Sequence, residues 1–233
     1  MNAIITGSTK GIGRSLLLGL LKEGWNVAAS SRNIEDLQVL KDEVHQWYPR
    51  QECLIDQVDF SKKDSTLAYA QTMLDRWSHI DLLINNAGVF LSGTVHQEED
   101  GVLERTMDLN LMSPYHLTRA LLPSMMSHRK GHIINMCSIA SFMSYPNGGA
   151  YTISKFALLG FSKALREEMK PYGIKVTSVM PGATWSASWA GADFPHERLM
   201  PPEDVAEIIL SATRLSHASV VEEIVIRPQL GDL

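Results

Sequence analysis

NAIITGSTKGIGRSLLL, residues 2–18, contains the pattern that decides the fold. An apolar run of strand length leads directly into three glycines spaced Gly-x-x-x-Gly-x-Gly, and an apolar stretch typical of a helix follows them. Because glycines leave room for a ligand at a helix N-terminus, where backbone N–H groups bind phosphate, this arrangement predicts a pyrophosphate site. The spacing is looser than the usual dinucleotide-binding pattern, so an ordinary strand-to-helix turn is the alternative. The candidate ligands are Gly7, Ser8, Lys10, Gly11, Ile12 and Gly13.

Strand-length apolar runs alternate with helix-length periodic stretches along the rest of the chain. Repeated strand–helix units predict an α/β fold, a Rossmann-type doubly wound parallel sheet with helices on both faces. We expect a single domain over residues 1–233, with ligands at the carboxyl ends of the strands. The predicted strands cover about residues 2–6, 26–30, 52–58, 81–85, 131–136, 173–179 and 222–226.

The composition excludes several classes of protein. The 233 residues are 45% hydrophobic and 20% charged, which suits one sizeable core. A net charge of -5 argues against a surface for nucleic acid or an anionic membrane. The first residues show no basic segment, apolar h-region or small-residue cleavage site, so we expect no signal peptide, and no apolar run reaches the roughly 18 residues of a membrane span. The sequence therefore predicts a soluble, cytoplasmic protein with no membrane and no nucleic-acid partner.

Cysteine and histidine show no pattern of a disulfide framework or a metal site. The two cysteines, Cys53 and Cys137, are expected to be buried thiols. The eight histidines lack the spacing of metal ligands, so we predict no structural or catalytic metal.

The second predicted strand ends without the acidic residue that usually contacts the ribose of NAD. Ser31 and Arg32 follow it instead: a serine leaves room for a 2′-phosphate, and an arginine can donate two hydrogen bonds to it. Lys10 in the glycine loop adds a second positive charge. The nearby acids lie in the segment 33–36, Asn-Ile-Glu-Asp, which is better explained as a capped first turn of a helix. These residues predict NADP(H) as the cofactor.

Tyr151 and Lys155 are four residues apart in a helix predicted over about residues 150–169, so they share one face. An ammonium about 4.5 Å from a phenol stabilises the phenolate by about 3.7 kcal/mol at an effective dielectric constant of roughly 20. Such a tyrosine can exchange protons near neutral pH. Most pairs at this spacing are ordinary surface contacts, so the interpretation depends on the motifs around them.

Four further motifs each have a structural alternative. Asp59, followed by Phe60, is as compatible with a helix cap as with ligand binding. The segment 85–88, Asn-Asn-Ala-Gly, is compatible with a simple turn, as is Ser138 after the fifth strand. Asn110 lies inside a helix predicted over about residues 98–128, although asparagine is a poor helix former. A polar residue on a wet face is the alternative there.

In this order, and over essentially the whole chain, the motifs closely resemble those of the short-chain dehydrogenase/reductase family. The resemblance implies that Ser138 orients a carbonyl oxygen while Tyr151 transfers its proton. Lys155 would favour the phenolate and hold the nicotinamide ribose. Asn110 would lie in a kinked helix, with its carbonyl holding a water that links the lysine to solvent. The implied catalytic residues are Asn110, Ser138, Tyr151 and Lys155.

The same resemblance implies a wall for the cofactor. Asp59 would accept a hydrogen bond from the adenine, with Phe60 beside it, and Thr184 would lie near the carboxamide. The segment after the sixth strand departs slightly from the commoner Pro-Gly-x-x-x-Thr form, because Ser186 stands where a threonine is expected. The implied wall residues are Asp59, Phe60, Asn86, Ala87, Gly88, Tyr151, Lys155, Pro181, Gly182 and Thr184.

These expectations combine into an NADPH-dependent carbonyl reductase that works reversibly as an alcohol dehydrogenase on a ketone, aldehyde or secondary alcohol. The alternatives within the family are a 3-oxoacyl-acyl-carrier-protein reductase, a sepiapterin-type reductase and a 3-hydroxy-acid dehydrogenase. A cofactor-sensing protein without catalysis is the alternative of a different class. Such a sensor would need only the glycine cleft.

The sequence also suggests a lid and an oligomer. Trp185, Trp189 and Phe194 lie among small residues, and we expect a substrate lid at about residues 183–200. By resemblance, two copies or two pairs of copies would associate through the two long helices into a dimer or tetramer. The basic run 128–130 most simply ends a helix, although contact with an acyl-carrier protein is an alternative.

Overall fold

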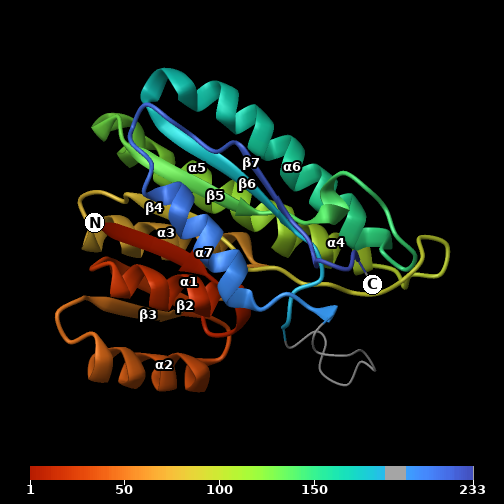
Figure 1. The fold of residues 1–233 in the computed structure, drawn as a ribbon, viewed down its shortest axis with the longest axis horizontal. Helices are drawn as coiled ribbons and strands as arrows, with labels where there is room; N and C mark the ends of the chain where they lie inside the picture. The colour runs from red at the N-terminus through yellow and green to blue at the C-terminus, as the bar shows by residue number, and fades with distance from the viewer. Residues whose placement is uncertain (187–197, 233) are drawn as a thin grey trace.

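The computed structural model describes residues 1–186 and 198–232, which form a seven-stranded parallel sheet covered by helices (Figure 1). The strand order is β3-β2-β1-β4-β5-β6-β7, so the chain starts in the middle of the sheet and changes its winding direction between β1 and β4. This is the doubly wound arrangement that the sequence predicts. The strands are β1 (Asn2–Thr6), β2 (Asn26–Ser31), β3 (Cys53–Gln57), β4 (Leu82–Asn85), β5 (Gly131–Met136), β6 (Ile174–Pro181) and β7 (Glu223–Ile226).

Helices pack on both faces of the sheet, and alternate residues of the strands face them. Ile5 belongs to a core with α1, α2 and α7, whereas its neighbour Ile4 belongs to a core with α3, α5 and α6. A strand covered on both faces is mostly apolar, which explains the apolar residues at the centres of the strands. The helices are α1 (Gly11–Lys22), α2 (Ile34–Trp47), α3 (Lys63–Arg76), α5 (Ser113–His128), α6 (Gly149–Met169) and α7 (Pro202–Thr213).

The helix predicted over residues 98–128 is not continuous. It begins only after Gly101, whose φ of 84° is left-handed, and α4 (Val102–Met107) then gives way to a π-helical segment at Asp108–Met112 before α5 starts. Glutamate at position 98 is therefore outside the helix. The distortion around Asn110 that the resemblance implies is present, and it takes the form of this π-helical segment.

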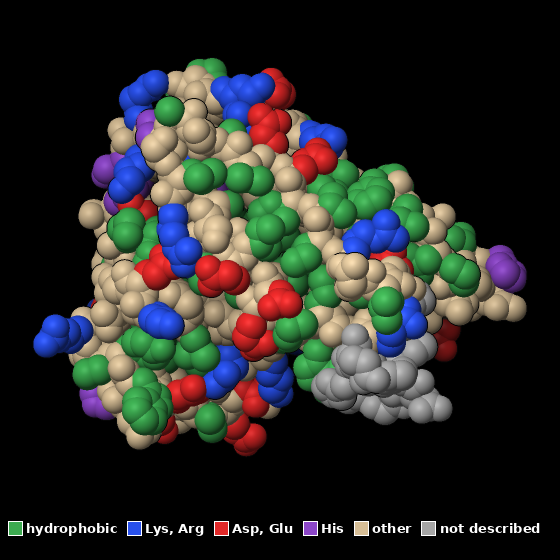
Figure 2. Space-filling view, in the orientation of Figure 1, with side chains coloured by type: hydrophobic (Ala, Val, Ile, Leu, Met, Phe, Trp, Pro, Cys, Tyr) green, Lys and Arg blue, Asp and Glu red, His purple; other side chains and the backbone are tan. Residues whose placement is uncertain are grey.

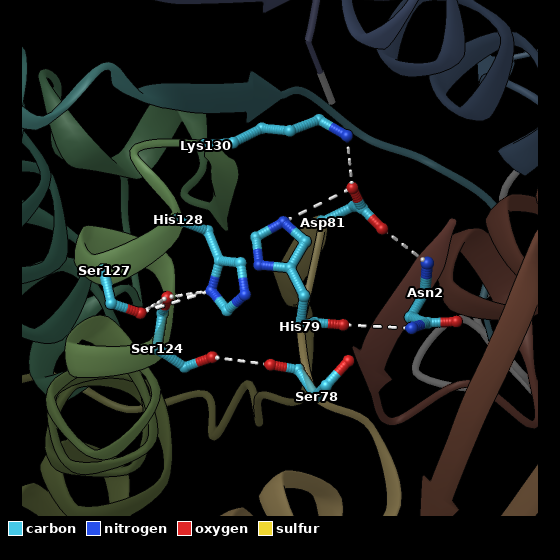
Figure 3. A network of polar contacts seen from close by, with 8 residues as sticks. All are labelled: Asn2, Ser78, His79, Asp81, Ser124, Ser127, His128 and Lys130. Atoms are coloured by element: carbon cyan, nitrogen blue, oxygen red, sulfur yellow. Dashed lines mark hydrogen bonds and ion pairs between the residues drawn. The ribbon is translucent and has the colours of Figure 1, made fainter.

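A polar network links the N-terminal ends of the central strands (Figure 3). Asp81, directly before β4, accepts hydrogen bonds from the backbone N–H of Asn2 at 2.9 Å and from Lys130 Nζ at 2.7 Å. The ring of His79 lies 3.4 Å from the same carboxylate and packs at a tilt against the ring of His128, with centroids 4.5 Å apart. These contacts join the starts of β1, β4 and β5, at the opposite ends of the strands from the predicted ligand site.

The two cysteines differ in burial, although both were expected to be buried. Both cysteines are free, but Cys53 is only partly buried, whereas Cys137 is fully buried as predicted. Cys53 lies on β3, the edge strand, where only one neighbour covers it. Across residues 1–186 and 198–232, no helix has the length and apolar character needed to cross a membrane.

Candidate active site

The loop after β1 is fixed against the end of β4, its neighbour in the sheet. Asn86 Nδ2 donates to the carbonyls of Thr6 and Gly7 at 3.0 and 2.9 Å. Thr6 Oγ1 in turn accepts from the backbone N–H groups of Asn86 and Ala87 at 3.0 and 2.9 Å. The structure therefore brings together two predicted cofactor-binding segments, and Thr6, which the sequence analysis did not single out, joins them.

Two glycines of the loop are required by close packing. A Cβ on Gly13 would lie 2.4 Å from the Gly7 carbonyl oxygen and 2.5 Å from Asn86 Nδ2. Gly7 has a φ of 66°, and a Cβ there would lie 3.1 Å from Ala87 Cα. The distances at Gly13 are far too short for a methyl group, and at Gly7 the left-handed φ together with the tight contact disfavours a side chain. These glycines let the loop lie against the end of β4.

Gly11 has a different role because the space beside it is open. It is the first residue of α1 and has a φ of 54°, and the nearest atom to an added Cβ would be Ser186 Cβ at 4.0 Å. A helix start leaves N–H groups without partners inside the helix, and the open space beside Gly11 leaves room there for a pyrophosphate. The hollow there has a volume of about 300 Å³ and is lined by Lys10, Gly11, Arg14, Ser15, Trp185, Ser186, Pro202 and Glu203.

Two loop side chains face the protein interior rather than this hollow. Ser8 Oγ is buried and accepts a hydrogen bond from the backbone N–H of Ser30 at 3.1 Å. Ile12 packs against the core under α1. Contacts of these two residues with a cofactor would therefore be made by the backbone.

The residues predicted to bind a 2′-phosphate lie where the loops after β1 and β2 meet. Thr9 Oγ1 is 3.4 Å from Ser31 Oγ, which also accepts from the backbone N–H of Asn33 at 3.2 Å. Arg32 is exposed at the surface beside them. Lys10, from the glycine loop, pairs with Asp36 at 2.7 Å. This ion pair joins residues 26 positions apart and does not follow from the local sequence pattern.

The segment 33–36 forms the capped helix start that the sequence predicts. Asn33 Oδ1 accepts from the backbone N–H groups of Glu35 and Asp36 at 2.8 and 3.1 Å at the start of α2. The acids occupy the first turn, where the helix dipole favours negative charge.

Asp59 and Phe60 after β3 are only partly arranged as expected. Asp59 Oδ1 accepts from the Ser61 hydroxyl at 2.7 Å and from the Ser61 N–H at 3.1 Å. The hydrogen bond from the Ser61 hydroxyl is the main reason that the pKa of Asp59 lies below its ordinary value. It does not cap α3, which starts at Lys63. The Phe60 ring is buried and packs edge-on against Tyr69, with centroids 5.5 Å apart, so its side chain faces the core, and a contact between Phe60 and an adenine stays a prediction.

Lys155 is the buried centre of the predicted catalytic group. Its side chain is only 6% exposed, and Nζ donates to the carbonyl of Met136, the last residue of β5, at 2.7 Å. Nζ also lies 5.6 Å from the centroid of the Tyr151 ring, as expected for two residues on one face of α6.

Ser138 and Phe90 complete the surroundings of the tyrosine. Ser138 follows β5 and starts a short 3₁₀ turn, where its Oγ accepts from the Ala140 N–H at 3.1 Å. This contact leaves the hydroxyl hydrogen free to donate. The Phe90 ring packs edge-on against Tyr151 at 5.0 Å between centroids and lies 6.4 Å from Tyr145. Burial, followed by the nearby Tyr151 phenol, raises the pKa of Tyr145.

Asn110 joins the loop after β4 to the catalytic helix. Its Oδ1 accepts from the Val89 N–H at 2.8 Å, and its Nδ2 donates to the Val89 carbonyl and to Ser154 Oγ, each at 3.0 Å. A Cβ on Gly88 would lie 3.2 Å from Asn110 Oδ1 and 3.7 Å from Lys155 Nζ, so these three residues meet. The side-chain carbonyl of Asn110 is thus occupied by backbone, and the water relay stays a prediction.

Glu98 is a residue near the site that the sequence analysis missed. Its Oε1 accepts from the backbone N–H of Ala150, directly before Tyr151, at 2.8 Å. A Cβ on Gly149 would lie 2.3 Å from this oxygen, and one on Gly93 would lie 2.8 Å from Glu98 Cγ. The glycines at 93, 148 and 149 were the available signal, since they mark a close approach of backbone and side chain.

The segment after β6 is fastened to the end of the chain and to itself. The Gly182 N–H donates to the Ile226 carbonyl at 2.8 Å, and Thr184 Oγ1 donates to the Gly182 carbonyl at 3.0 Å. The Met200 N–H donates to the Ala183 carbonyl at 3.0 Å. The two ends of the predicted lid, residues 183–200, thus lie side by side. Trp185 is partly exposed, while Trp189 and Phe194 lie outside the described residues.

No set of three or more His, Cys, Asp or Glu side chains within 1–186 and 198–232 has an arrangement suited to a metal ion. The absence of a metal from this protein stays a prediction.

Comparison with known proteins agrees with this geometry. A family model described as short chain dehydrogenase matches residues 1–193. The sepiapterin reductase of Chlorobaculum tepidum is 30% identical, over 99% of this chain and 97% of its own.

Solved structures show the same fold. A metagenomic short-chain oxidoreductase in complex with NADP has a TM-score of 0.86 at 29% identity, and the match covers 98% of this chain and 97% of that one. The L-sorbose reductase from Gluconobacter frateurii, complexed with NADPH and L-sorbose, has a TM-score of 0.88 at 25% identity, with 97% and 95% covered.

Proposed function

The chain belongs to the short-chain dehydrogenase family, and we propose that it is an NADP(H)-dependent oxidoreductase that interconverts a carbonyl compound and an alcohol. The observation that carries this proposal is the buried Lys155 ammonium, held by the Met136 carbonyl at 2.7 Å and placed 5.6 Å from the Tyr151 ring. A non-catalytic nucleotide sensor has no need for a buried charge beside a phenol, because burying it costs free energy.

The described residues fit a dinucleotide. The start of α1 and the open space at Gly11 suit the pyrophosphate, and the corner of Lys10, Ser31 and Arg32 suits a 2′-phosphate. When bound, the nicotinamide cofactor supplies the hydride or accepts it. The residues proposed to hold it are Gly7, Ser8, Lys10, Gly11, Ile12, Gly13, Ser31, Arg32, Asp59, Phe60, Asn86, Ala87, Gly88, Tyr151, Lys155, Pro181, Gly182 and Thr184.

The chain's own part in the reaction is proton transfer and orientation. In the reducing direction, Tyr151 donates its phenolic proton to the carbonyl oxygen, and in the oxidising direction the phenolate takes the proton back. Lys155 favours the phenolate by its charge. The free hydroxyl hydrogen of Ser138 can donate to the substrate oxygen and fix its position. Asn110 keeps the loop at Val89 in register with α6.

NADP(H) rather than NAD(H) is supported by two cationic side chains, Lys10 and Arg32, and by the absence of an acid at the end of β2. The solved relatives described above carry NADP or NADPH.

The surroundings of Tyr151 favour an apolar or aromatic carbonyl substrate. Phe90 and Tyr145 flank the phenol, and Phe142 and Met143, which follow the Ser138 turn, are exposed. Rings of this kind stack on planar substrates. A sepiapterin-type reductase is the most specific second candidate, since the Chlorobaculum tepidum relative bears that name. A 3-oxoacyl-acyl-carrier-protein reductase and a 3-hydroxy-acid dehydrogenase remain the other candidates.

The test is NADPH oxidation against a panel of aldehydes, diketones, β-ketoesters, 3-oxoacyl thioesters and sepiapterin. We expect turnover with at least one class, and greater efficiency with aromatic members. Tight NADPH binding without turnover on any of them would instead support the sensor. The same panel with NADH shows whether the cofactor preference holds.

We also propose that the protein is a homo-oligomer. Ile153 and Phe156 on α6 and Val225 on β7 are exposed, and Figure 2 shows hydrophobic side chains gathered over these two elements. A second copy would cover them. Analytical ultracentrifugation at micromolar concentration is expected to give a dimer or tetramer, and a single monomeric species would contradict this.

A further inference from the structure

Lys10, a proposed ligand of the cofactor 2′-phosphate, is already engaged by an acid of this chain. Its Nζ lies 2.7 Å from Asp36 Oδ2. Lys10 belongs to the loop between β1 and α1, and Asp36 belongs to the first turn of α2, so the ion pair spans the corner in which the phosphate is proposed to bind. A lysine has one ammonium, and a carboxylate and a phosphate compete for it.

The carboxylate is held in place by its own helix. The Asp36 N–H donates to Asn33 Oδ1 at 3.1 Å, which fixes this residue in the capped first turn of α2. The loops it faces are also joined by the contact between Thr9 and Ser31. The position of Asp36 is thus set by the fold and not by the flexible lysine.

We propose that Asp36 is a specificity-determining residue, whose carboxylate competes with the cofactor 2′-phosphate for Lys10 and so limits the preference for NADP(H) over NAD(H). This inference rests on the proposed function. NAD(H) has a free ribose hydroxyl at this position and can leave the Lys10–Asp36 pair intact. NADP(H) must take the ammonium from Asp36 and then place a phosphate near a carboxylate of the same charge sign.

The exposure of the pair sets the size of the effect. The Lys10 side chain is 63% exposed and that of Asp36 is 29% exposed, so solvent screens their attraction and a doubly charged phosphate can displace the carboxylate. The effect of Asp36 is therefore a graded one. The next cation along α1, Arg14, does not take the place of Lys10, because it is already paired with Glu43 at 2.6 Å.

The test is calorimetric titration of NADP⁺ and NAD⁺ into the wild type and Asp36→Asn. Asparagine is nearly isosteric and removes only the charge. We expect NADP⁺ to bind about 3- to 10-fold more tightly, with NAD⁺ affinity changing less than about twofold. The gain should shrink at high salt, because exposed charge interactions are screened.

Glu35→Gln is the matched control, since Glu35 lies in the same helical turn and loses the same charge. It should change NADP⁺ affinity less than Asp36→Asn does. In a Lys10→Gln background, Asp36→Asn should give a smaller gain, because the contested ammonium is gone. Thermal unfolding of each variant confirms that it is folded.

Three outcomes would overturn the proposal while leaving the proposed function in place. The first is weaker NADP⁺ binding by Asp36→Asn, which would show that Asp36 prepares Lys10 for the phosphate. The second is unchanged NADP⁺ binding by Asp36→Asn. The third is an equal gain in NADP⁺ affinity from Glu35→Gln. Failure of the proposed function looks different. The wild type would then bind NAD⁺ at least as tightly as NADP⁺, before any variant is made.

Discussion

The phenol of Tyr151 is positioned by contacts on two sides that do not involve its hydroxyl. Phe90 packs edge-on against the ring at 5.0 Å, and Lys155 lies 5.6 Å from its centroid, anchored by the Met136 carbonyl. The ring can therefore keep its place when the hydroxyl is removed. Removing the hydroxyl therefore tests its role in proton transfer without disturbing the packing of the ring.

Tyr151→Phe is expected to reduce turnover to below a few percent of wild type and to leave NADPH binding nearly unchanged. The substitution removes one proton donor and very little volume. Steady-state rates and fluorescence titration of NADPH measure the two effects separately. Substantial remaining turnover would exclude Tyr151 as the proton donor.

The Ser31 position is expected to control cofactor choice. Ser31→Asp should reverse the preference for NADPH, because a carboxylate repels the 2′-phosphate and accepts from free ribose hydroxyls. Aspartate can still accept the hydrogen bond that Ser31 Oγ receives from the Asn33 N–H, so the turn should survive. The measurement is the ratio of kcat/KM for NADPH and NADH, which we expect to be roughly 100-fold or more in the wild type. Equal use of both cofactors by the wild type would contradict a phosphate-binding corner.

Among the elements, α6 is the one that carries the proposed catalysis, and its N-terminus is capped from a distance. Glu98, 52 residues earlier in the chain, accepts from the Ala150 N–H at 2.8 Å, and the Gly93 carbonyl accepts from the Gly149 N–H at 3.0 Å. These contacts satisfy N–H groups that a helix start leaves unpaired. They also fix the turn on which Tyr151 lies.

Glu98→Ala is expected to lower the free energy of unfolding by about 1 kcal/mol, as for loss of a helix cap. Since the cap adjoins Tyr151, we also expect kcat to fall more than the affinity for NADPH. Glu98→Gln keeps an acceptor oxygen and should restore most of both losses. The exposed neighbour Glu99 provides the control, Glu99→Ala. An unchanged kcat in Glu98→Ala would limit Glu98 to a structural role.

At the scale of elements, the sequence predicts best what depends on local pattern. The strands agree with the predicted ranges to within two residues, because each contains adjacent apolar residues that stand out from the helix-length stretches around it. Asn33 was identifiable as a cap from four consecutive residues. The helix start at Val102 was missed because the preceding residues are good helix formers, and Gly101 alone marks the boundary.

Contacts between residues far apart in the sequence could not be predicted from local pattern. Phe60 looks like a residue beside a ligand, yet its ring packs on Tyr69 in the core. Glu98 and Asp36 look like ordinary surface acids, and only the fold places one at the start of α6 and the other against Lys10. Asn110 was predicted from its poor fit to a helix, but its bonds with Val89 and Ser154 follow from the π-helical segment.

At the scale of the whole molecule, the buried His132 links stability to pH. It lies on β5, and its Nε2 is 2.8 Å from Thr177 Oγ1 on β6. Thr177 donates its own proton to the Val221 carbonyl, so His132 must be the donor in this contact. Burial, helped by the charge of Lys175, lowers the pKa of His132 to about 4.

Acid is therefore expected to destabilise the fold as pH falls from about 6.5 to about 4. In this window the unfolded chain binds a proton at His132 and the folded protein does not, so protonation favours unfolding. His132→Gln should reduce the loss of unfolding free energy between pH 7 and pH 4.5 by about 2 kcal/mol. Urea unfolding at several pH values measures this. His45→Gln, at an exposed position on α2, is the control, and an equal change in both variants would exclude a special role for His132.

The order of strands in the sheet has a consequence for folding during synthesis. β1 and β2 can pair as soon as they leave the ribosome, and β3 joins them on one side. The next strand, β4, pairs with β1 on the other side of the sheet. After that, β5, β6 and β7 each pair with the strand that was synthesised just before. The growing sheet thus exposes a single unfinished edge, which advances in the order of translation. Because that edge is where a partly made sheet is most open to aggregation, each new strand protects the previous one as it emerges.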